Sequence, residues 1–304
     1  MIDWGRGIVQ AANFKGREFL IKRDDLLSPT INGNKAYKFF FLLQKNFNHI
    51  VSYGGNQSNA MLSLSYIAKE KNAKFTYFTP PLSKYLKNNI HGNFKLAKQN
   101  GAIIKESKES LETKAKTFAK ENNAIFINQG GNVEQDEGIE KLARQILNLD
   151  KNNLCVFCSS GSGISAFLLQ NKLDSIDVIT TPCVGGSEFL IKEFEKFKLQ
   201  FESKPPFESK FRPIFESKST FKTPRIILPK KKYHFAKPNI DLLNIYKEWL
   251  NKGIEFDLIY DCVMWKAIED NLQNLEYENY LFLHSGGLSA NESILERYKF
   301  LNLF

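Results

Sequence analysis

Short apolar runs alternate with helical patterns along most of this chain. The run at 49–53 (HIVSY) ends in two glycines, and the run at 154–158 (LCVFC) ends in a loop of serines and glycines. Each is followed by a segment with apolar residues at helical spacing, at 59–71 and 164–171. Short apolar runs separated by helices are typical of parallel strands that are buried on both faces. The alternation therefore predicts an α/β fold with mostly parallel sheets.

The chain is long enough to bury a sizeable core in one large domain or two smaller ones. It has 304 residues, of which 42% are hydrophobic, and ~150–250 residues are typical of one large unit. We predict strands at 18–22, 49–53, 74–80, 102–105, 124–128, 154–158, 177–182, 225–229 and 280–287. We predict helices at 34–43, 59–71, 89–100, 164–171, 187–199, 241–251 and 263–274.

Basic residues outnumber acidic residues, with 42 Lys and Arg against 33 Asp and Glu and a formal net charge of +9. An excess of this kind can serve an acidic partner such as nucleic acid. However, the lysines are scattered through Asn- and Phe-rich sequence, without a zinc-finger or aromatic RNA-binding motif. We therefore attribute the charge to general lysine enrichment and expect no nucleic-acid partner.

The four cysteines predict neither a metal site nor a disulfide framework. Cys155 and Cys158 form a C-x-x-C, but no second pair or nearby His cluster completes a zinc site. Residues three apart on a strand point to opposite faces, so these two thiols cannot bind one metal together. We expect buried, free thiols, because disulfide frameworks occur mainly in short, cysteine-dense secreted chains.

The N-terminal sequence MIDWGRGIVQ lacks the basic start and apolar run of a signal peptide. No uncharged window reaches the ~18 apolar residues that a membrane span requires. We therefore expect a cytoplasmic protein without a membrane partner.

A short repeat interrupts the alternation of strands and helices. FESK occurs at Phe201, Phe207 and Phe215, within a run of Pro, Ser, Lys and Phe that ends near Pro224. The repeat is irregular and far shorter than the ~20–50 residues of a solenoid unit. We interpret 200–224 as a flexible surface insertion between two elements of the sheet, and a partner-binding loop is the alternative.

Lys35 lies in an unusual setting for a lysine, at the predicted start of a helix after Asn-Gly-Asn. The partial positive charge at a helix N-terminus disfavours a cation and tolerates a neutral amine better. A neutral amine is what captures an aldehyde, and burial lowers the pKa of lysine. Lys38 lies one turn further on, where it could reach a bound anion. The alternative is two solvated lysines on an amphipathic helix.

Two further segments place glycine and hydroxyl groups between a strand and a helix. In 52–59 (SYGGNQSN), Ser58 and Asn59 fall at the start of a helix whose free N–H groups could bind a carboxylate. The loop in 158–165 (CSSGSGIS) could hold a phosphate with backbone amides and hydroxyls. The alternatives are a simple N-cap in the first segment and an ordinary turn in the second.

Polar residues also follow apolar runs at 257–262 (DLIYDC) and 284–287 (HSGG). Either segment could cap an element without further function. His284 has no partner at metal-ligand spacing, so we predict a hydrogen-bonded structural histidine.

Together these segments resemble the fold-type II pyridoxal-phosphate enzymes, and more narrowly the family of 1-aminocyclopropane-1-carboxylate deaminase and D-cysteine desulfhydrase. The most specific pair is GNKAYK followed by GGNQSN. The resemblance covers nearly the whole chain apart from the insertion and a short N-terminus. It rests on IKRDDLLSPTINGNKAYK, VSYGGNQSNA, FINQGGN (Phe126–Asn132), CSSGSGISA, KKYHFAKP, DLIYD and LHSGG.

The resemblance implies a tryptophan synthase beta-like fold of two three-layer α/β/α domains with mostly parallel sheets. The small domain would be 46–142, inserted into a large domain formed by 1–45 and 143–304. Pyridoxal 5'-phosphate would lie in the cleft between the domains, where α/β sheets usually bind ligands. The resemblance also implies a homodimer and a small amino-acid substrate.

The resemblance assigns roles to individual residues. Lys35 would carry the cofactor, and Lys38 would contact its phosphate. Ser58 would be an acid, base or nucleophile near the substrate α-carbon, and Asn59 would steady the cofactor ring oxygen. Tyr260 would be a polar catalytic group beside the substrate. The phosphate cup would consist of Ser160, Gly161, Ser162 and Gly163, and the pyridine nitrogen would lie near Asp261 and Ser285.

Two of these positions bear on the reaction. The deaminase pattern has Glu after the tyrosine and Leu between His and Gly-Gly, where this chain has Asp261 and Ser285. A hydroxyl at the second position is more like the desulfhydrase pattern, although Asp261 matches neither well. We favour a D-cysteine desulfhydrase, with the deaminase as the alternative. The presence of both Lys35 and Ser58 argues against a relative that binds cofactor or amino acid without turnover.

Overall fold

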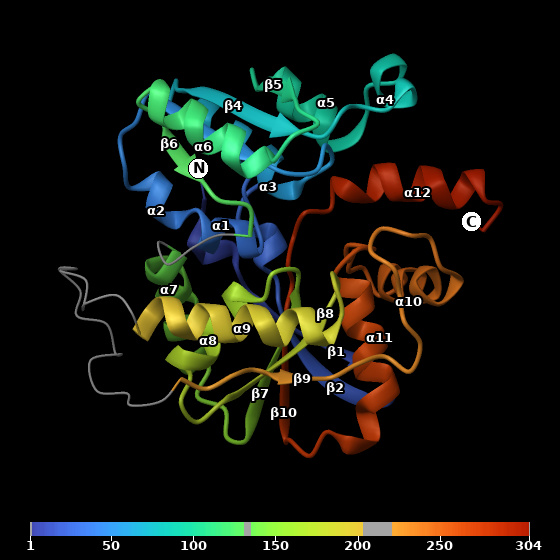
Figure 1. The fold of residues 1–304 in the computed structure, drawn as a ribbon. Helices are drawn as coiled ribbons and strands as arrows, with labels where there is room; N and C mark the ends of the chain where they lie inside the picture. The colour runs from blue at the N-terminus through green and yellow to red at the C-terminus, as the bar shows by residue number, and fades with distance from the viewer. Residues whose placement is uncertain (1, 131–134, 203–220, 304) are drawn as a thin grey trace.

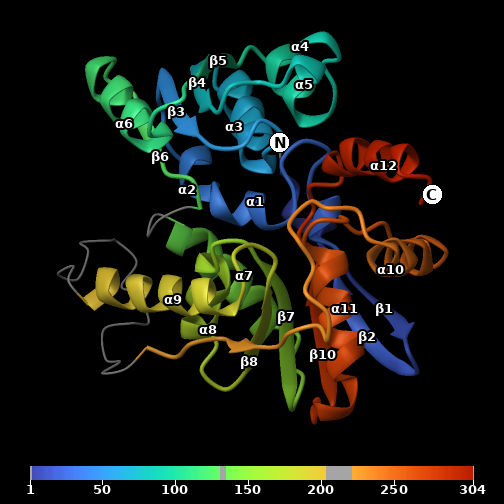
Figure 2. The ribbon, with the colours of Figure 1, turned by 45° about the vertical axis from the view of Figure 1, so that its right-hand side comes forward.

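Two mostly parallel β-sheets form the framework of the chain, as a computed structural model shows for residues 2–130, 135–202 and 221–303 (Figure 1). One sheet has six strands and the other has four. Helices cover both faces of each sheet (Figures 1 and 2). This architecture confirms the predicted α/β class with mostly parallel sheets.

The six-stranded sheet has the order β1-β2-β10-β7-β8-β9. Only β1 and β2 pair antiparallel, as a hairpin, and every other pairing in the sheet is parallel. The sequence patterns missed β1, whose side chains are mostly exposed or half-buried and therefore form no apolar run. The strands are β1 (Val9–Phe14), β2 (Arg17–Lys22), β7 (Leu154–Ser160), β8 (Asp177–Pro182), β9 (Arg225–Ile226) and β10 (Asn279–Leu283).

The centre of this sheet is buried on both faces, which explains the continuous apolar run in β7. Cys155 and Phe157 pack into one hydrophobic cluster, whereas Val156 packs into the cluster on the opposite face. Cys158 lies against that second cluster, so the two cysteines point to opposite faces as predicted. All four cysteines are free.

Helices α7 (Asp136–Leu147), α8 (Ile164–Lys172) and α9 (Ser187–Glu202) lie on one face of the large sheet, and α10 (Ile240–Leu250) and α11 (Asp261–Asn271) lie on the other (Figure 2). Short 3-10 helices occur at Trp4–Arg6, Asp24–Leu26 and Leu272–Asn274. The last of these extends α11, which explains the longer helix predicted at 263–274.

The four-stranded sheet is entirely parallel, with the order β5-β4-β3-β6. Its apolar contacts divide into a cluster that includes α3 and α5 and a smaller one that includes α6. The helix predicted at 89–100 corresponds to α5, which begins at Gly92, and the patterns missed the short helix α4 before it. The elements are β3 (His49–Tyr53), β4 (Lys74–Thr79), β5 (Ile103–Glu106), β6 (Ile125–Ile127), α3 (Asn59–Glu70), α4 (Lys84–Asn88), α5 (Gly92–Gln99) and α6 (Leu111–Glu121).

The helix predicted at 34–43 is broken into α1 (Asn34–Lys38) and α2 (Phe40–Leu43). The break is at Phe39, whose backbone φ of −102° and ψ of 13° are not helical. Helix α12 (Ala290–Phe300) follows the last strand and contacts α5 of the small sheet, as Figure 1 shows.

The predicted flexible insertion at 200–224 falls largely on 203–220, which lie outside the described residues, as do two of the three FESK repeats. Helix α9 covers 200–202, and Phe221 packs against the ring of Phe167. In the parts of the chain that the structure describes, no helix is long and apolar enough to cross a membrane.

Candidate active site

The loop before α1 packs against the end of strand β10. The N–H of Asn34 donates to the carbonyl of Ser285 at 3.1 Å, and the N–H of Gly287 donates to Oδ1 of Asn32 at 3.3 Å. Gly33 has a φ of +54°, and a Cβ there would lie 1.9 Å from the Ser285 oxygen. Only glycine permits this approach, which places Lys35 beside the carboxyl end of β10.

Lys35 is partly buried, and its Nζ donates to Oδ1 of Asn34 at 2.6 Å. Desolvation lowers the pKa of its amine from 10.5 to about 8, against the opposing charges of Asp257 and Asp261. Because α1 has only five residues, burial and not a helix dipole accounts for this shift. The structure thus supplies the neutral amine that aldehyde capture requires.

Lys38 is a buried cation without a counter-ion. Its side chain makes no hydrogen bond or ion pair within the described residues, and its Nζ lies 5.6 Å from the ring centre of Phe39. Desolvation and the nearby charge of Lys35 hold the pKa of Lys38 well below its usual value. A bound anion would provide the missing negative charge.

The loop between β7 and α8 uses its hydroxyl groups within the protein. Ser160 Oγ lies 2.6 Å from Oγ1 of Thr180 in β8, and Ser162 Oγ donates to the carbonyl of Gly130 at 3.2 Å. In contrast, the backbone N–H groups of Gly161, Ser162 and Gly163 donate to no group in the described part of the chain. The donors that this loop offers a phosphate are therefore backbone amides at the start of a nine-residue helix.

Glycine is required at the end of this loop for two reasons. Gly163 has a φ of +82°, which disfavours any residue with a side chain. A Cβ at Gly163 would lie 2.3 Å from Cδ1 of Leu190 in α9. At Gly161, a Cβ would lie 3.4 Å from Cε1 of Tyr260, so the loop and the tyrosine are neighbours.

Asp257 anchors the segment that leads into α11, a role that the sequence analysis did not assign. It is fully buried and accepts the N–H groups of Ile259, Tyr260 and Asp261 at 2.9, 2.8 and 3.0 Å. It also accepts the hydroxyl of Ser285 at 3.1 Å. The D-x-x-x-D spacing before a helix was the available signal for this anchor.

Asp261 is also fully buried, and it joins three separate segments. Its carboxylate accepts the Ser159 hydroxyl and the Ser285 N–H, each at 3.0 Å. Desolvation and then the charge of Asp257 raise the pKa of Asp261 well above its usual value. Burial therefore favours the protonated form of this carboxyl group.

His284 has the structural role that its sequence context predicts. Its Nε2 lies 2.7 Å from the carbonyl of Glu255, and its Nδ1 accepts the N–H of Gly286 at 3.1 Å. These partners require the neutral ring with the proton on Nε2, and desolvation lowers the pKa of the ring. Within the described residues, no three His, Cys, Asp or Glu side chains are grouped to hold a metal ion.

Ser58 caps helix α3, and Asn59 is the first residue of that helix. Ser58 Oγ accepts the N–H groups of Ala60 and Met61 at 3.2 and 3.3 Å. The N-cap alternative is therefore observed, and it leaves the hydroxyl proton of Ser58 free to donate. Asn59 approaches the end of β10, since a Cβ on Gly287 would lie 2.4 Å from Asn59 Nδ2.

Tyr260 is partly buried between the loop that follows β7 and the segment before α10. Its ring meets that of Phe235 edge-on, with centroids 5.7 Å apart. Desolvation raises the pKa of its hydroxyl, which is therefore protonated at neutral pH.

The structure thus gathers most of the predicted site residues at the carboxyl ends of β3, β7 and β10. Direct contacts or close charge interactions connect Lys35, Asn59, Gly161, Tyr260, Asp261 and Ser285. Ser58 and Lys38 flank this group in α3 and α1. Ser160 differs, because its hydroxyl is directed to β8.

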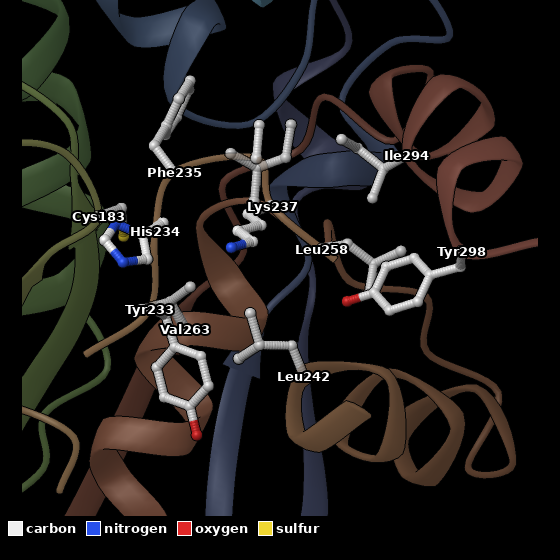
Figure 3. A pocket seen from close by; sticks show the side chains of 12 residues that line it. Cys183, Tyr233, His234, Phe235, Lys237, Leu242, Leu258, Val263, Ile294 and Tyr298 are labelled. Carbon is white, nitrogen blue, oxygen red and sulfur yellow. The ribbon is translucent and has the colours of Figure 1, made fainter. Parts of the chain in front are cut away.

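Two cavities lie near these segments. The one in Figure 3 is mostly apolar, lies between the 233–237 segment and α10, α11 and α12, and includes none of the predicted site residues. The other is lined by Asn34, Ser159, His284 and Ser285 among others. Lys35 and Asp261 contact residues that line this second cavity, through Asn34 and Ser159.

Comparison with known proteins agrees with this fold. No family model matches the chain. A curated protein of Thermotoga maritima named "Putative 1-aminocyclopropane-1-carboxylate deaminase" is 23% identical over 300 residues, covering 90% of this chain and 89% of the relative.

Solved structures also match this chain over most of its length. An ACC deaminase homologue has a TM-score of 0.77 at 20% identity, over 100% of this chain and 95% of its own. A pyridoxal 5'-phosphate-dependent aspartate racemase has a TM-score of 0.59 at 14% identity, over 93% and 90%. A hydrogen sulfide-producing enzyme of Fusobacterium nucleatum has a TM-score of 0.60 at 16% identity, over 92% and 93%. The fold is therefore that of fold-type II pyridoxal-phosphate enzymes, and the resemblance predicted from the motifs is confirmed.

Proposed function

We propose that this chain is a pyridoxal-phosphate-dependent lyase that carries its cofactor on Lys35 and acts on a small amino acid. The observation that carries the proposal is the amine of Lys35, whose pKa is about 8, beside two buried carboxylates. A lysine in this state reacts with an aldehyde near neutral pH, whereas an ordinary lysine is almost entirely protonated there.

The residues around Lys35 fit this cofactor. Lys38 is a buried cation without a counter-ion, and the loop that ends at Gly163 presents unpaired backbone N–H groups. Together they match the charge and acceptors of a phosphate. Asn59 would face the ring oxygen, and Asp261 would face the pyridine nitrogen with support from Ser285.

The cofactor, when bound, supplies an electron sink for negative charge at the substrate α-carbon. The protein supplies the groups that bind the substrate and move its protons. Lys35, once released from the cofactor, can take a proton as a neutral amine and return it as an ammonium ion. Ser58 can do the same through its hydroxyl, and the N–H of Asn59, which donates to no group in the described residues, can bind the substrate carboxylate. Tyr260, protonated at neutral pH, can donate to the substrate.

D-cysteine is the substrate that we favour. D-cysteine would lose its β-thiol as sulfide. Hydrolysis of the remainder of the substrate would then yield pyruvate and ammonia. The hydroxyl of Ser285 supports this assignment, because the desulfhydrase pattern has a small polar residue there. Structural similarity to a hydrogen sulfide-producing enzyme adds support.

The alternative is 1-aminocyclopropane-1-carboxylate deaminase, which opens a cyclopropane ring to give 2-oxobutanoate and ammonia. The Thermotoga relative and the ACC deaminase homologue support it at least as well. Asp261 is closer to the Glu of the deaminase pattern than to an uncharged residue. The two reactions share Lys35 and Ser58, so the choice between them depends on the substrate pocket.

The assembly and organisation that go with this function are also proposals. We infer a cytoplasmic homodimer with a small domain at 46–142 inserted into a large domain. The strands of the four-stranded sheet all lie within that range, between His49 and Ile127.

A substrate panel tests the function. The purified, cofactor-loaded chain is offered D- and L-cysteine, other D- and L-amino acids and 1-aminocyclopropane-1-carboxylate, and sulfide and 2-oxo acids are measured. Sulfide with pyruvate from D-cysteine supports the desulfhydrase, and 2-oxobutanoate from the cyclopropane supports the deaminase. Release of neither product from any compound overturns the lyase assignment. Borohydride reduction must attach the cofactor to Lys35; attachment elsewhere overturns the assignment of the site.

A further inference from the structure

Asn93 is a fully buried polar residue that connects three segments around Asn59. It lies at the start of α5, remote in sequence from every other candidate site residue. Its Nδ2 donates to the carbonyl of Gln57 at 3.0 Å and to Oδ1 of Asn59 at 2.7 Å. Its Oδ1 accepts the hydroxyl of Ser289 at 2.7 Å.

These hydrogen bonds determine which side of each amide group carries the nitrogen and which carries the oxygen. The Gln57 carbonyl can only accept, so the Asn93 atom beside it must be the nitrogen. That nitrogen also faces Asn59, whose nearer atom must therefore be the oxygen. The NH2 group of Asn59 is left on the opposite side.

The NH2 group of Asn59 is directed to the candidate active site. Nδ2 of Asn59 makes no hydrogen bond within the described residues and approaches Gly287, where a Cβ would lie only 2.4 Å away. Gly287 follows β10 and is bonded to the loop before Lys35. Asn59 Nδ2 is thus an unpaired donor beside the segment that follows β10.

We propose that Asn93 is a positioning residue that sets the amide of Asn59 so that its NH2 group donates to the ring oxygen of the cofactor. The proposal rests on the function proposed above. Asn93 acts from outside the site, through one hydrogen bond to Asn59. Its bond to Ser289, just before α12, also links this orientation to the C-terminal segment.

The consequence can be measured on the lysine-bound cofactor. A donor to the ring oxygen stabilises negative charge there, which lowers the proton affinity of the neighbouring nitrogen bonded to Lys35. If Asn59 instead turned its amide oxygen to the ring, that oxygen and the ring oxygen would repel each other. The pH midpoint of the lysine-bound cofactor's absorbance change would then rise.

The test is Asn93→Asp in the cofactor-loaded chain. Aspartate keeps the size of asparagine, and in its ionised form it cannot donate, so Asn59 is expected to rotate its NH2 group towards position 93. We expect the absorbance midpoint to rise by about half a pH unit or more, since one hydrogen bond is worth ~0.5–1.5 kcal/mol and one unit is ~1.4 kcal/mol. The cofactor dissociation constant should rise by about threefold or more.

Asn100→Asp is the matched control. Asn100 caps the other end of α5 and donates from its amide to Ser65 Oγ at 3.0 Å. This change should leave the midpoint of the wild type unaltered. If Asn93→Asp does not fold, Asn93→Ala removes the donated bonds without burying a carboxylate and should raise the midpoint in the same direction.

A double variant separates positioning from general loosening. In Asn59→Ala, which lacks the amide, adding the change at Asn93 should shift the midpoint no further. An additional shift, or a midpoint in Asn93→Asp equal to that of the wild type, overturns the proposal. A wild-type chain that forms no lysine-bound chromophore overturns the proposed function itself, and this inference with it.

Discussion

Ser285 donates its backbone N–H to the carboxylate of Asp261 at 3.0 Å, across 24 residues of sequence. The bond ties the end of strand β10 to the start of helix α11. The hydroxyl of Ser285 donates to Asp257 as well, so one residue holds both buried carboxylates. The negative charges of both favour the protonated form of Lys35, yet desolvation outweighs them and lowers its pKa.

The rate at which the cofactor-free chain captures pyridoxal phosphate should rise with pH, with a midpoint at about pH 8, and level off at higher pH. The reactive form of Lys35 is the neutral amine, whose fraction grows as pH passes the pKa of about 8. Rapid mixing followed by absorbance at a series of pH values measures this rate. Lys35→Ala reports the background from other lysines and should show no saturable capture. A midpoint near 10 in the wild type would contradict the lowered pKa.

Replacing Lys38 with Met should have opposite effects on stability and on cofactor binding. Removing a buried amine that lacks a partner in the described residues should raise the free energy of unfolding of the cofactor-free chain by about 1–3 kcal/mol. Loss of its charge-assisted bond to the phosphate should raise the cofactor dissociation constant by about tenfold or more. Denaturant unfolding and fluorescence titration measure the two effects.

Lys172→Met is the control for this pair of effects. Lys172 is equally buried, but its Nζ lies 2.8 Å from Asp136 and 3.0 Å from Glu140. Its removal should lower stability, because Asp136 and Glu140 each lose an ion pair with a buried lysine. If both variants changed stability in the same direction, the absence of a counter-ion at Lys38 would not be the cause.

Ser58→Ala should retain the cofactor, reduce turnover at least about a hundredfold and lower stability by about 1 kcal/mol. The stability loss follows from removing the N-cap of α3, and the loss of turnover follows from removing the hydroxyl. Ser110→Ala removes the equivalent cap of α6, whose Oγ accepts the N–H of Thr113 at 3.3 Å. That control should lose similar stability with unchanged turnover. Full activity in Ser58→Ala would exclude its hydroxyl from the reaction.

Gly33→Ala should destabilise the chain by about 3 kcal/mol or more and weaken cofactor binding. Its new Cβ would overlap the Ser285 carbonyl and force apart the Lys35 loop and β10. Gly16→Ala also places a residue at positive φ (+81°), in an exposed turn with nothing within 4 Å of the new Cβ. It should cost only about 1 kcal/mol, with cofactor binding unchanged. Thermal melting and cofactor titration distinguish the two variants. Equal losses of stability would mean that backbone strain at positive φ, and not the overlap with Ser285, causes the destabilisation.

Local patterns identified most elements of this fold, because burial on both faces of a parallel sheet leaves continuous apolar runs. Strand β7, helix α3 and the loop that contains Gly161 were predicted close to their observed positions. The patterns failed where burial was partial or geometry was irregular. Strand β1 carries no apolar run, and the break at Phe39 has no glycine or proline to mark it.

The sequence by itself determined which chemical groups the candidate site contains, since lysine, serine and glycine at particular spacings are readable without coordinates. Only the tertiary structure decided what those groups can do. The pKa of Lys35 depends on Asp257 and Asp261, more than 200 residues away, and the orientation of Asn59 depends on Asn93. The proton affinity of Lys35 and the direction of the Asn59 donor are set by neighbours in space. The order of the strands determines those neighbours, and no local sequence pattern encodes that order.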